Sequence, residues 1–394
     1  MKQQVFSYVW PGQVHLGFGA ARMTMAEAAR LAGRRSPRLF VLVDPGVRAV
    51  GLLDQLDLNS DQIVIFDQIV ANPDVTSVDL AAAAFRASEA EVIVGVGGGS
   101  ALDTAKAVRQ LAGGPPEASI ADYFLALGQR ARPMPHPRDL PPMIAVPTTA
   151  GTGSEVTPWG VITQTETHFK SGIGGPELLP NVALIDPALT LSLPRFLTAA
   201  TGMDALSHCV EAYVSTHNQP ALDPLLLRAI RLIGQNLPLA VEQPDNREAR
   251  ANMLEASMLG GIGISSNWLG ACHSLAHPLS SLAQVHHGHA CALMLPHQMR
   301  YSLSHAVERY ADIANALEPT GAGQATPAAR AERAPELVHH LNLALGLPTR
   351  LREAGVGAEL LTPLSQAAIR DLNWMTNPCP LDQTGMLQLY NAAY

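Results

Sequence analysis

The first half of the chain alternates short, continuously apolar runs with alanine-rich amphipathic stretches such as Val78–Glu91 and Ala101–Leu111. A run that is apolar at every position is typical of a strand in a parallel sheet whose two faces are both covered. The apolar or β-branched runs that predict strands are Leu39–Val43, Gln62–Phe66, Val92–Val96 and Met143–Val146, and further short strands are expected at Trp159–Thr163 and Val182–Asp186. The pattern therefore predicts an α/β domain with a parallel sheet.

From about Pro187 the chain changes to long helical patterns, and Pro187 and Pro194 interrupt it at the change. The predicted helices are Ala199–Val214, Pro224–Asn236, Ala249–Ile264 and Arg300–Leu317. A length of 394 residues allows two domains. We expect an α/β domain at residues 1–188 and an all-α domain at residues 189–394. Two Pro/Gly-rich segments, Gly113–Pro142 and Glu318–Pro335, are expected to be surface loops with at most one short helix each.

Composition excludes several classes of protein. With 47% hydrophobic and 15% charged residues the chain can bury a large core, and its net charge of -8 argues against a nucleic-acid partner. Four cysteines without a CxxC motif favour a reducing compartment. No signal peptide is evident, and the apolar stretch Met258–Cys272 is interpreted as one buried helix rather than a membrane span. We expect a cytoplasmic protein with no membrane partner.

Histidines and one aspartate form a spaced pattern in the second half. Asp204 and His208 are four residues apart, and so are His273 and His277, so each pair shares a helix face. Six of the fourteen histidines lie between His273 and His297. One carboxylate and several imidazoles suit a divalent ion such as Fe²⁺ or Zn²⁺. A buried histidine is more often a core residue than a ligand, but this clustering favours a metal site.

The sequence Gly97-Gly98-Gly99-Ser100 follows the strand Val92–Val96 and opens a helix. Glycines let the backbone approach an anion, and the helix start offers free N–H groups, so a pyrophosphate is the expected ligand. The alternative is a tight turn with nothing bound. Asp44 ends another strand, where a carboxylate can bind ribose hydroxyls and disfavour NADP, or can simply cap the next helix.

Taken together, these motifs resemble the iron-containing (group III) alcohol dehydrogenases, over nearly the full chain. The residues that carry the resemblance are Gly97–Ser100 with Asp103 and Lys106, Pro147–Glu155, the set Asp204, His208, His273, His277 and His287, and the shorter matches Val14–Gly19, Asn72–Pro73 and Asn377–Pro378. The resemblance implies an N-terminal α/β nucleotide-binding domain and an all-α C-terminal domain, an architecture shared with dehydroquinate synthase-like proteins.

The resemblance also implies roles for individual residues. The metal ligands would be Asp204, His208, His273 and His287, and His277 would handle a proton beside the ion. The cofactor contacts would be Asp44, Gly97, Gly98, Gly99, Ser100, Asp103, Thr148, Thr149, Thr152, Lys170 and Leu197. His286 and His289 flank His287 and leave open which imidazole coordinates. The cofactors would be NAD and Fe²⁺, with Zn²⁺ as the alternative metal.

The reaction expected from the resemblance is reversible hydride transfer between a small alcohol or aldehyde and the nicotinamide. The ion would act as a Lewis acid and His277 would relay the proton. The alternatives are a maleylacetate reductase, a zinc glycerol dehydrogenase-like enzyme, a dehydroquinate synthase-like lyase and a non-catalytic metal and nucleotide sensor. The absence of Lys and Arg between Arg250 and Arg300 disfavours a substrate with several phosphates. We also expect a homodimer or a larger homo-oligomer.

Overall fold

The computed structural model describes residues 5–58, 60–125, 132–167, 169–319 and 326–394. It divides into two compact units. The α/β unit consists of Trp10–Thr149 and Gly153–Ser192, and the helical unit consists of Leu193–Tyr394, Ala150–Thr152 and the described residues before Trp10. The predicted fold class, a parallel α/β region followed by an all-helical region, is confirmed.

A six-stranded sheet forms the centre of the α/β unit, and every neighbouring pair of its strands is parallel. Its strands are β1 (Gln13–Leu16), β2 (Leu39–Val43), β3 (Ile63–Phe66), β4 (Val92–Gly97), β5 (Met143–Pro147) and β8 (Val182–Ile185), in the order β1-β8-β5-β4-β2-β3. A separate antiparallel pair is formed by β6 (Trp159–Thr163) and β7 (Lys170–Gly174). The edge strand β1 and the glycine-containing β7 were not predicted.

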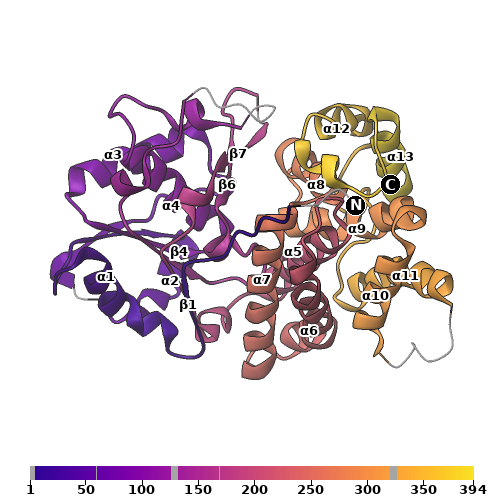
Figure 1. Cartoon of the computed structure of the whole chain (residues 1–394), viewed down its shortest axis with the longest axis horizontal. Helices are drawn as coiled ribbons and strands as arrows, with labels where there is room; N and C mark the ends of the chain where they lie inside the picture. The colour runs from indigo at the N-terminus through magenta and orange to yellow at the C-terminus, as the bar shows by residue number, and fades with distance from the viewer. Residues whose placement is uncertain (1–4, 59, 126–131, 168, 320–325) are drawn as a thin grey trace. The chain divides into compact units, whose positions relative to one another are not determined.

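Helices cover both faces of this sheet, as the continuously apolar strands require. They are α1 (Thr24–Ala32), α2 (Pro45–Ala49), α3 (Val75–Ser88) and α4 (Gly99–Ala112). Phe40 and Leu42 of β2 belong to the hydrophobic core that contains α3 and α4 residues. Leu39, Val41 and Val43 of the same strand belong to a second core with α1 and α2 residues. Figure 1 shows α3 and α4 on one side of β4 and α1 and α2 on the other.

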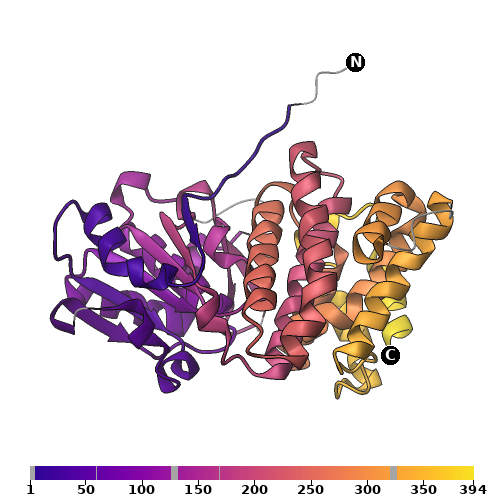
Figure 2. The ribbon, with the colours of Figure 1, turned by 90° about the horizontal axis from the view of Figure 1, so that it is seen from below.

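The helical unit is built around α5 (Arg195–Val214), which is buried along nearly its whole length. A helix without a solvent-exposed face belongs in the centre of a bundle. Its other long helices are α6 (Asp223–Glu242), α7 (Arg247–Asn267), α8 (Ala271–Leu282), α9 (His287–Ser302), α10 (Val307–Leu317), α11 (Pro327–Ala344), α12 (Leu361–Ala368) and α13 (Gln383–Ala393). Figure 2 shows the helices of this unit that are coloured red to orange running side by side. In the described part of the chain, every helix is too short or too polar to cross a membrane.

The prediction of one buried helix over Met258–Cys272 is wrong. The chain leaves the helix at Trp268, whose φ of 66° is left-handed, and α8 begins at Ala271. The carbonyl of Asn267 accepts the Ser215 hydroxyl, and the Asn267 side chain donates to the Ala212 carbonyl. These bonds hold the end of α7 against the end of α5 and compete with continuation of the helix.

Two other predicted segments also differ from the structure. The pattern Arg300–Leu317 is not one helix, because α9 ends at Ser302 and α10 begins at Val307. Glu318–Pro335 is not mainly a loop, because α11 begins at Pro327 and continues through Pro335. Thr326 caps that helix and Pro327 occupies its first turn, where a proline is tolerated. Within the two predicted loops, residues 126–131 and 320–325 lie outside the described residues.

Candidate active site

Three helices of the helical unit bring the predicted metal ligands together. Asp204 and His208 lie one turn apart on α5, His273 lies in the first turn of α8, and His287 is the first residue of α9. The close approach of α9 to α5 depends on Gly288, since a Cβ atom there would lie 2.2 Å from the Ala200 carbonyl oxygen. This glycine allows His287 to reach Asp204.

The Asp204 carboxylate is the centre of the cluster. Its Oδ1 atom lies 3.6 Å from Nε2 of His273, 3.6 Å from Nε2 of His287 and 3.7 Å from Nε2 of His208. This oxygen is buried and accepts no hydrogen bond from the described residues. Donors that share one tetrahedral ion at about 2.1 Å lie about 3.4 Å apart. The burial, the spacing and the O and N donor atoms therefore fit a divalent ion.

One compact set of possible ligands differs from the predicted set in one member. Ligand atoms of Asp204, His273, His287 and Cys291 all lie within 4.8 Å of one another. His208 does not belong to this set, although its Nε2 points at Asp204 while its Nδ1 lies 3.2 Å from the Gly151 carbonyl. The structure thus brings the three predicted imidazole ligands around one oxygen of the fourth, Asp204, and adds a sulfur.

The electrostatics of the cluster favour a charged carboxylate. Burial alone would raise the pKa of Asp204, but His208, His287 and His273 hold it well below its ordinary value. Burial lowers the pKa of His208. Burial alone would also lower the pKa of His273, but Cys291 and Glu211 raise it well above its ordinary value. Neutral imidazole and ionised carboxylate are the forms that bind metal ions.

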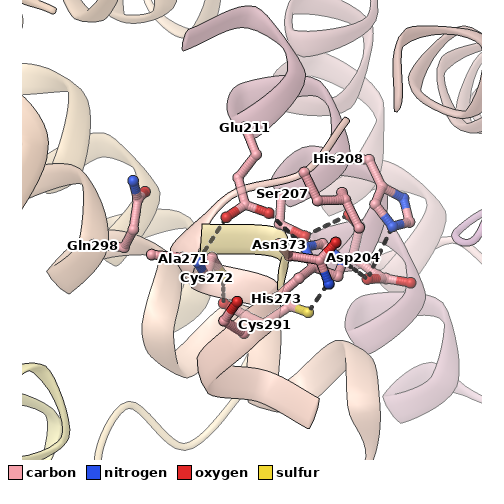
Figure 3. A network of polar contacts seen from close by, with 12 residues as sticks. Asp204, Ser207, His208, Glu211, Ala271, Cys272, His273, Cys291, Gln298 and Asn373 are labelled. Atoms are coloured by element: carbon pink, nitrogen blue, oxygen red, sulfur yellow. Dashed lines mark hydrogen bonds and ion pairs between the residues drawn. The ribbon is translucent and has the colours of Figure 1, made fainter. Parts of the chain in front are cut away.

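Glu211, one turn beyond His208 on α5, fixes the orientation of His273. Its Oε2 atom accepts a 2.5 Å hydrogen bond from Nδ1 of His273, and its Oε1 accepts a 2.6 Å bond from the Cys272 backbone N–H. Figure 3 shows this carboxylate directed at both residues. A carboxylate on the far nitrogen of a histidine leaves its Nε2 as the ligand atom and holds the ring in place.

His277 lies beside the cluster and is held by a carboxylate of its own. Its Nδ1 donates to Asp371 Oδ2 at 2.6 Å, and the Ser274 hydroxyl donates to the other oxygen of Asp371 at 3.1 Å. Burial would raise the pKa of Asp371, but His277 keeps it below its ordinary value. The His277 ring stacks on His287 with centroids 5.2 Å apart. His277 is thus close to the cluster without being one of the nitrogens around Asp204 Oδ1.

The geometry also distinguishes among the three neighbouring histidines at the start of α9. Nε2 of His289 lies 3.1 Å from the Pro348 carbonyl, and the His286 ring packs edge-on against Phe196 at 5.7 Å. His287 is the one that lies 3.6 Å from Asp204. The arrangement therefore favours His287 as the coordinating imidazole.

In the α/β unit, the predicted cofactor residues meet at the carboxyl ends of β2, β4 and β5. Gly97 has a φ of 150°, and a Cβ atom there would lie 2.7 Å from Cβ of Ala101 and 3.1 Å from Cβ of Asp44. The Gly97 carbonyl accepts the Thr148 N–H, and Gly98 lies against the Thr149 side chain. Such an edge, followed by the start of a 14-residue helix, is the usual place for a phosphate in an open α/β sheet.

Asp44 caps α2, with its Oδ1 accepting from the Gly46 and Val47 backbone N–H groups at 2.8 and 3.3 Å. The structure therefore shows Asp44 as a helix cap, which is one of the two roles that the sequence left open. Asp103 is engaged as well, because its carboxylate accepts bonds from the Ser154 hydroxyl and the Val161 N–H.

The remaining predicted cofactor residues are distributed over the two units. Gly99 and Ser100 are in the first turn of α4, and Lys170 begins β7. Thr152 and Leu197 belong to the helical unit. Buried Lys106 joins the loop after β5 to α4 by donating to the Ser154 and Thr157 hydroxyls at 2.7 and 2.9 Å, and burial lowers its pKa to about 8.

Sequence reasoning missed three residues of the cluster: Glu211, Cys291 and Asp371. Two of them had a local signal, because Glu211 lies three residues after His208 and Cys291 lies four after His287, each on the same helix face. Asp371 had no local signal in the sequence, because it is 94 residues from His277.

Two family models match the chain. Residues 11–187 match the model described as iron-containing alcohol dehydrogenase, and residues 198–394 match the C-terminal model of the Fe-containing alcohol dehydrogenase family. The 1,3-propanediol dehydrogenase of Klebsiella pneumoniae is 36% identical over 400 residues and is covered completely, as is this chain.

Solved structures agree with these matches. A 1,3-propanediol oxidoreductase superposes with a TM-score of 0.91 and 35% identity, covering 99% of this chain and 100% of that one. The sulfoacetaldehyde reductase of Bifidobacterium kashiwanohense, solved in complex with NAD⁺, gives a TM-score of 0.86 and 31% identity, with 99% of each chain covered.

Proposed function

The chain belongs to the iron-containing alcohol dehydrogenase family of oxidoreductases, and on that premise we propose that it transfers hydride between a small alcohol and NAD with a divalent metal ion held by Asp204, His208, His273 and His287. One observation carries the proposal. A buried carboxylate oxygen without a hydrogen-bond donor among the described residues has three imidazole nitrogens 3.6 to 3.7 Å away.

A divalent ion at this position supplies a Lewis acid for the substrate oxygen. The chain's own contribution is a rigid set of ligands. Glu211 fixes the ring of His273, and Gly288 lets α9 approach closely enough for His287 to reach Asp204. Either Fe²⁺ or Zn²⁺ suits one carboxylate and three imidazoles.

His277 is proposed to be the catalytic residue that moves the proton between the substrate oxygen and solvent. Because Asp371 accepts a bond from Nδ1, Nε2 is the ring atom left to exchange a proton with the substrate. The His277 side chain is 11% exposed and the His287 side chain is 25% exposed, whereas His273 is fully enclosed. Asp371 is a positioning residue, since it acts through His277.

NAD is proposed to bind the glycine-rich edge of the α/β unit through Gly97, Gly98, Gly99 and Ser100, with Thr148 and Thr149 beside it. The NAD⁺ complex of the similar sulfoacetaldehyde reductase supports this choice of cofactor. The other contacts that we propose are Asp44, Asp103, Thr152, Lys170 and Leu197. Asp44 would favour NAD over NADP, because a carboxylate repels a 2′-phosphate.

The substrate is proposed to be a small alcohol or the corresponding aldehyde. Relatives that match most of this chain are named for different alcohols: 1,3-propanediol, choline, 4-hydroxybutyrate and methanol. These different names support a small alcohol as the class of substrate and do not single out one alcohol. The proposal also includes a domain boundary between residues 188 and 189, a cytoplasmic location and a homodimer or larger homo-oligomer.

The test is metal removal and reconstitution. Protein stripped of metal by a chelator under anaerobic conditions should form no NADH from a panel of short alcohols, diols and choline. Fe²⁺ or Zn²⁺ added back at one equivalent should restore NADH formation. Full activity in the stripped protein would contradict a metal-dependent dehydrogenase, and the oligomeric state is checked on the same samples by light scattering.

A further inference from the structure

Cys291 is the fourth member of the tight cluster, and the family resemblance assigns it no role. It lies on α9 one turn after His287, and its side chain is fully buried. Its sulfur lies 3.8 Å from Nε2 of His287 and 3.9 Å from Nε2 of His273. These are the same two nitrogens that lie 3.6 Å from Asp204 Oδ1. Figure 3 shows the sulfur beside His273.

Most buried cysteines are small packing residues, and Cys209 on α5 is an example. Its sulfur lies 4.0 Å from the Ala256 carbonyl and faces the backbone of Gly260, where a Cβ atom would be 3.0 Å away. It contacts α7 and closes the space between two helices. Cys291 differs, because its sulfur faces two nitrogens that converge on a carboxylate.

The spacing around Cys291 is that of a ligand. With metal–sulfur and metal–nitrogen bonds of about 2.3 and 2.1 Å, a sulfur and a nitrogen on one tetrahedral ion lie about 3.6 Å apart. The observed sulfur–nitrogen distances exceed that value by only a few tenths of an ångström. The observed oxygen–nitrogen distances exceed their own ideal by a similar margin.

We propose that Cys291 supplies a thiolate ligand to the divalent ion that Asp204, His273 and His287 hold. This inference rests on the metal site of the proposed function. Coordination would break the S–H bond, form a metal–sulfur bond and release the proton to the buffer. Asp204, His273, His287 and Cys291 would then hold the ion, with His208 Nε2 beside them at 3.7 Å from Asp204 Oδ1.

A sulfur ligand changes which metal the site prefers. Thiolate is a soft ligand that favours Zn²⁺, whereas carboxylate and imidazole ligands also suit Fe²⁺. The wild-type protein should therefore take up Zn²⁺ in preference to Fe²⁺ when both are offered anaerobically in equal amounts. Cys291→Ser should shift the bound ratio towards Fe²⁺.

The direct probe is Co²⁺, added to the full-length metal-free protein. Cobalt bound by a thiolate has a charge-transfer absorption in the near ultraviolet that cobalt bound only by nitrogen and oxygen lacks. We expect this band in the wild type in proportion to bound cobalt, its loss in Cys291→Ser and Cys291→Ala, and its retention in Cys379→Ser. Cys379→Ser removes a thiol outside the cluster, and circular dichroism verifies that each variant is folded.

X-ray absorption of the zinc-loaded wild type supplies a readout that needs no variant. We expect one sulfur at about 2.3 Å from zinc. Cobalt and zinc that bind with only nitrogen and oxygen neighbours would overturn the inference and leave the metal site intact. A band that persists in both Cys291 variants would overturn it as well. A wild-type protein that binds neither ion would overturn the metal site itself.

Discussion

The proposed metal site of the helical unit and the glycine-rich edge of the α/β unit are built in opposite ways. The cluster is made of side chains, and two of its histidines are held by other side chains, His273 by Glu211 and His277 by Asp371. The edge is made mainly of backbone, with Gly97 and Gly98 against Thr148 and Thr149. The difference follows from the ligands, because an ion needs donor atoms at fixed points and a phosphate needs N–H groups without obstruction.

It follows that the two regions should fail differently when they are mutated. Truncating one side chain of the cluster should abolish metal binding. At the glycine-rich edge, truncation of a side chain should have little effect on cofactor binding, whereas an added methyl group should weaken it. Variants in the two regions test that contrast.

Removal of an imidazole that we propose as a ligand should have the largest effect. His273→Ala and His287→Ala should lose both metal and turnover, and a loss of several kcal/mol of transition-state stabilisation is roughly a thousandfold in kcat. Metal content by mass spectrometry and NADH formation are the measurements. The matched control is His289→Ala, which removes a neighbouring imidazole bonded to the Pro348 carbonyl and should keep its metal. Wild-type metal content in both ligand variants would refute the assignment.

Loss of the proposed proton carrier should be less severe. His277→Ala should keep its metal, lose roughly 10²-fold in kcat and shift the pH profile of kcat. Asp371→Asn should give a smaller loss, because the ring remains while its carboxylate partner is gone. If His277→Ala loses metal instead, His277 is a ligand and the role of His287 is in doubt. A normal kcat and pH profile would make it a packing residue.

A methyl group at the edge should weaken cofactor binding without touching the cluster. Gly97→Ala places a Cβ atom 2.7 Å from Ala101 at a φ of 150°, so we expect the KM for NAD to rise roughly tenfold while metal content stays constant. Gly33→Ala is the control, since Gly33 also has a positive φ (66°) but has no atom within 4 Å of an added Cβ. An equal rise in both variants would point to general strain instead of a lost cofactor contact.

The smallest effect should come from Asp44. Asp44→Gly should improve the use of NADP relative to NAD by removing a negative charge that would face the 2′-phosphate. The measurement is kcat/KM with each cofactor. A ratio that changes by less than about twofold, or under ~0.5 kcal/mol, would leave Asp44 as the cap of α2 alone.

The fold was predictable where burial alone decided the structure. The apolar run Leu39–Val43 is β2 with unchanged bounds, because every one of its side chains enters a core. The strand β7 was missed because Lys170–Gly174 contains two glycines and pairs only with β6. The break at Trp268 was also missed, since it depends on bonds from Asn267 to residues some 50 positions away.

The candidate site divides in the same way. A spacing of four residues predicted that Asp204 shares a helix face with His208, and that His273 shares one with His277. The structure brings these four residues close together. The partner carboxylate Asp371 was not predictable, because only the packing of the segment after α12 against α8 brings it to His277. Local periodicity thus identifies which side chains share a face, while the residue that holds each of them is decided by tertiary packing.

The origin of the ligands on three helices has a consequence for the lifetime of the protein. An ion bound by Asp204, His273 and His287 would cross-link the three helices α5, α8 and α9. Binding to the folded chain alone adds about 2.7 kcal/mol to the free energy of unfolding at roughly one hundred times the Kd of the ion. Lack of the metal ion would then expose the chain to proteolysis in addition to removing its activity. The abundance of the protein would follow the metal supply of the cell.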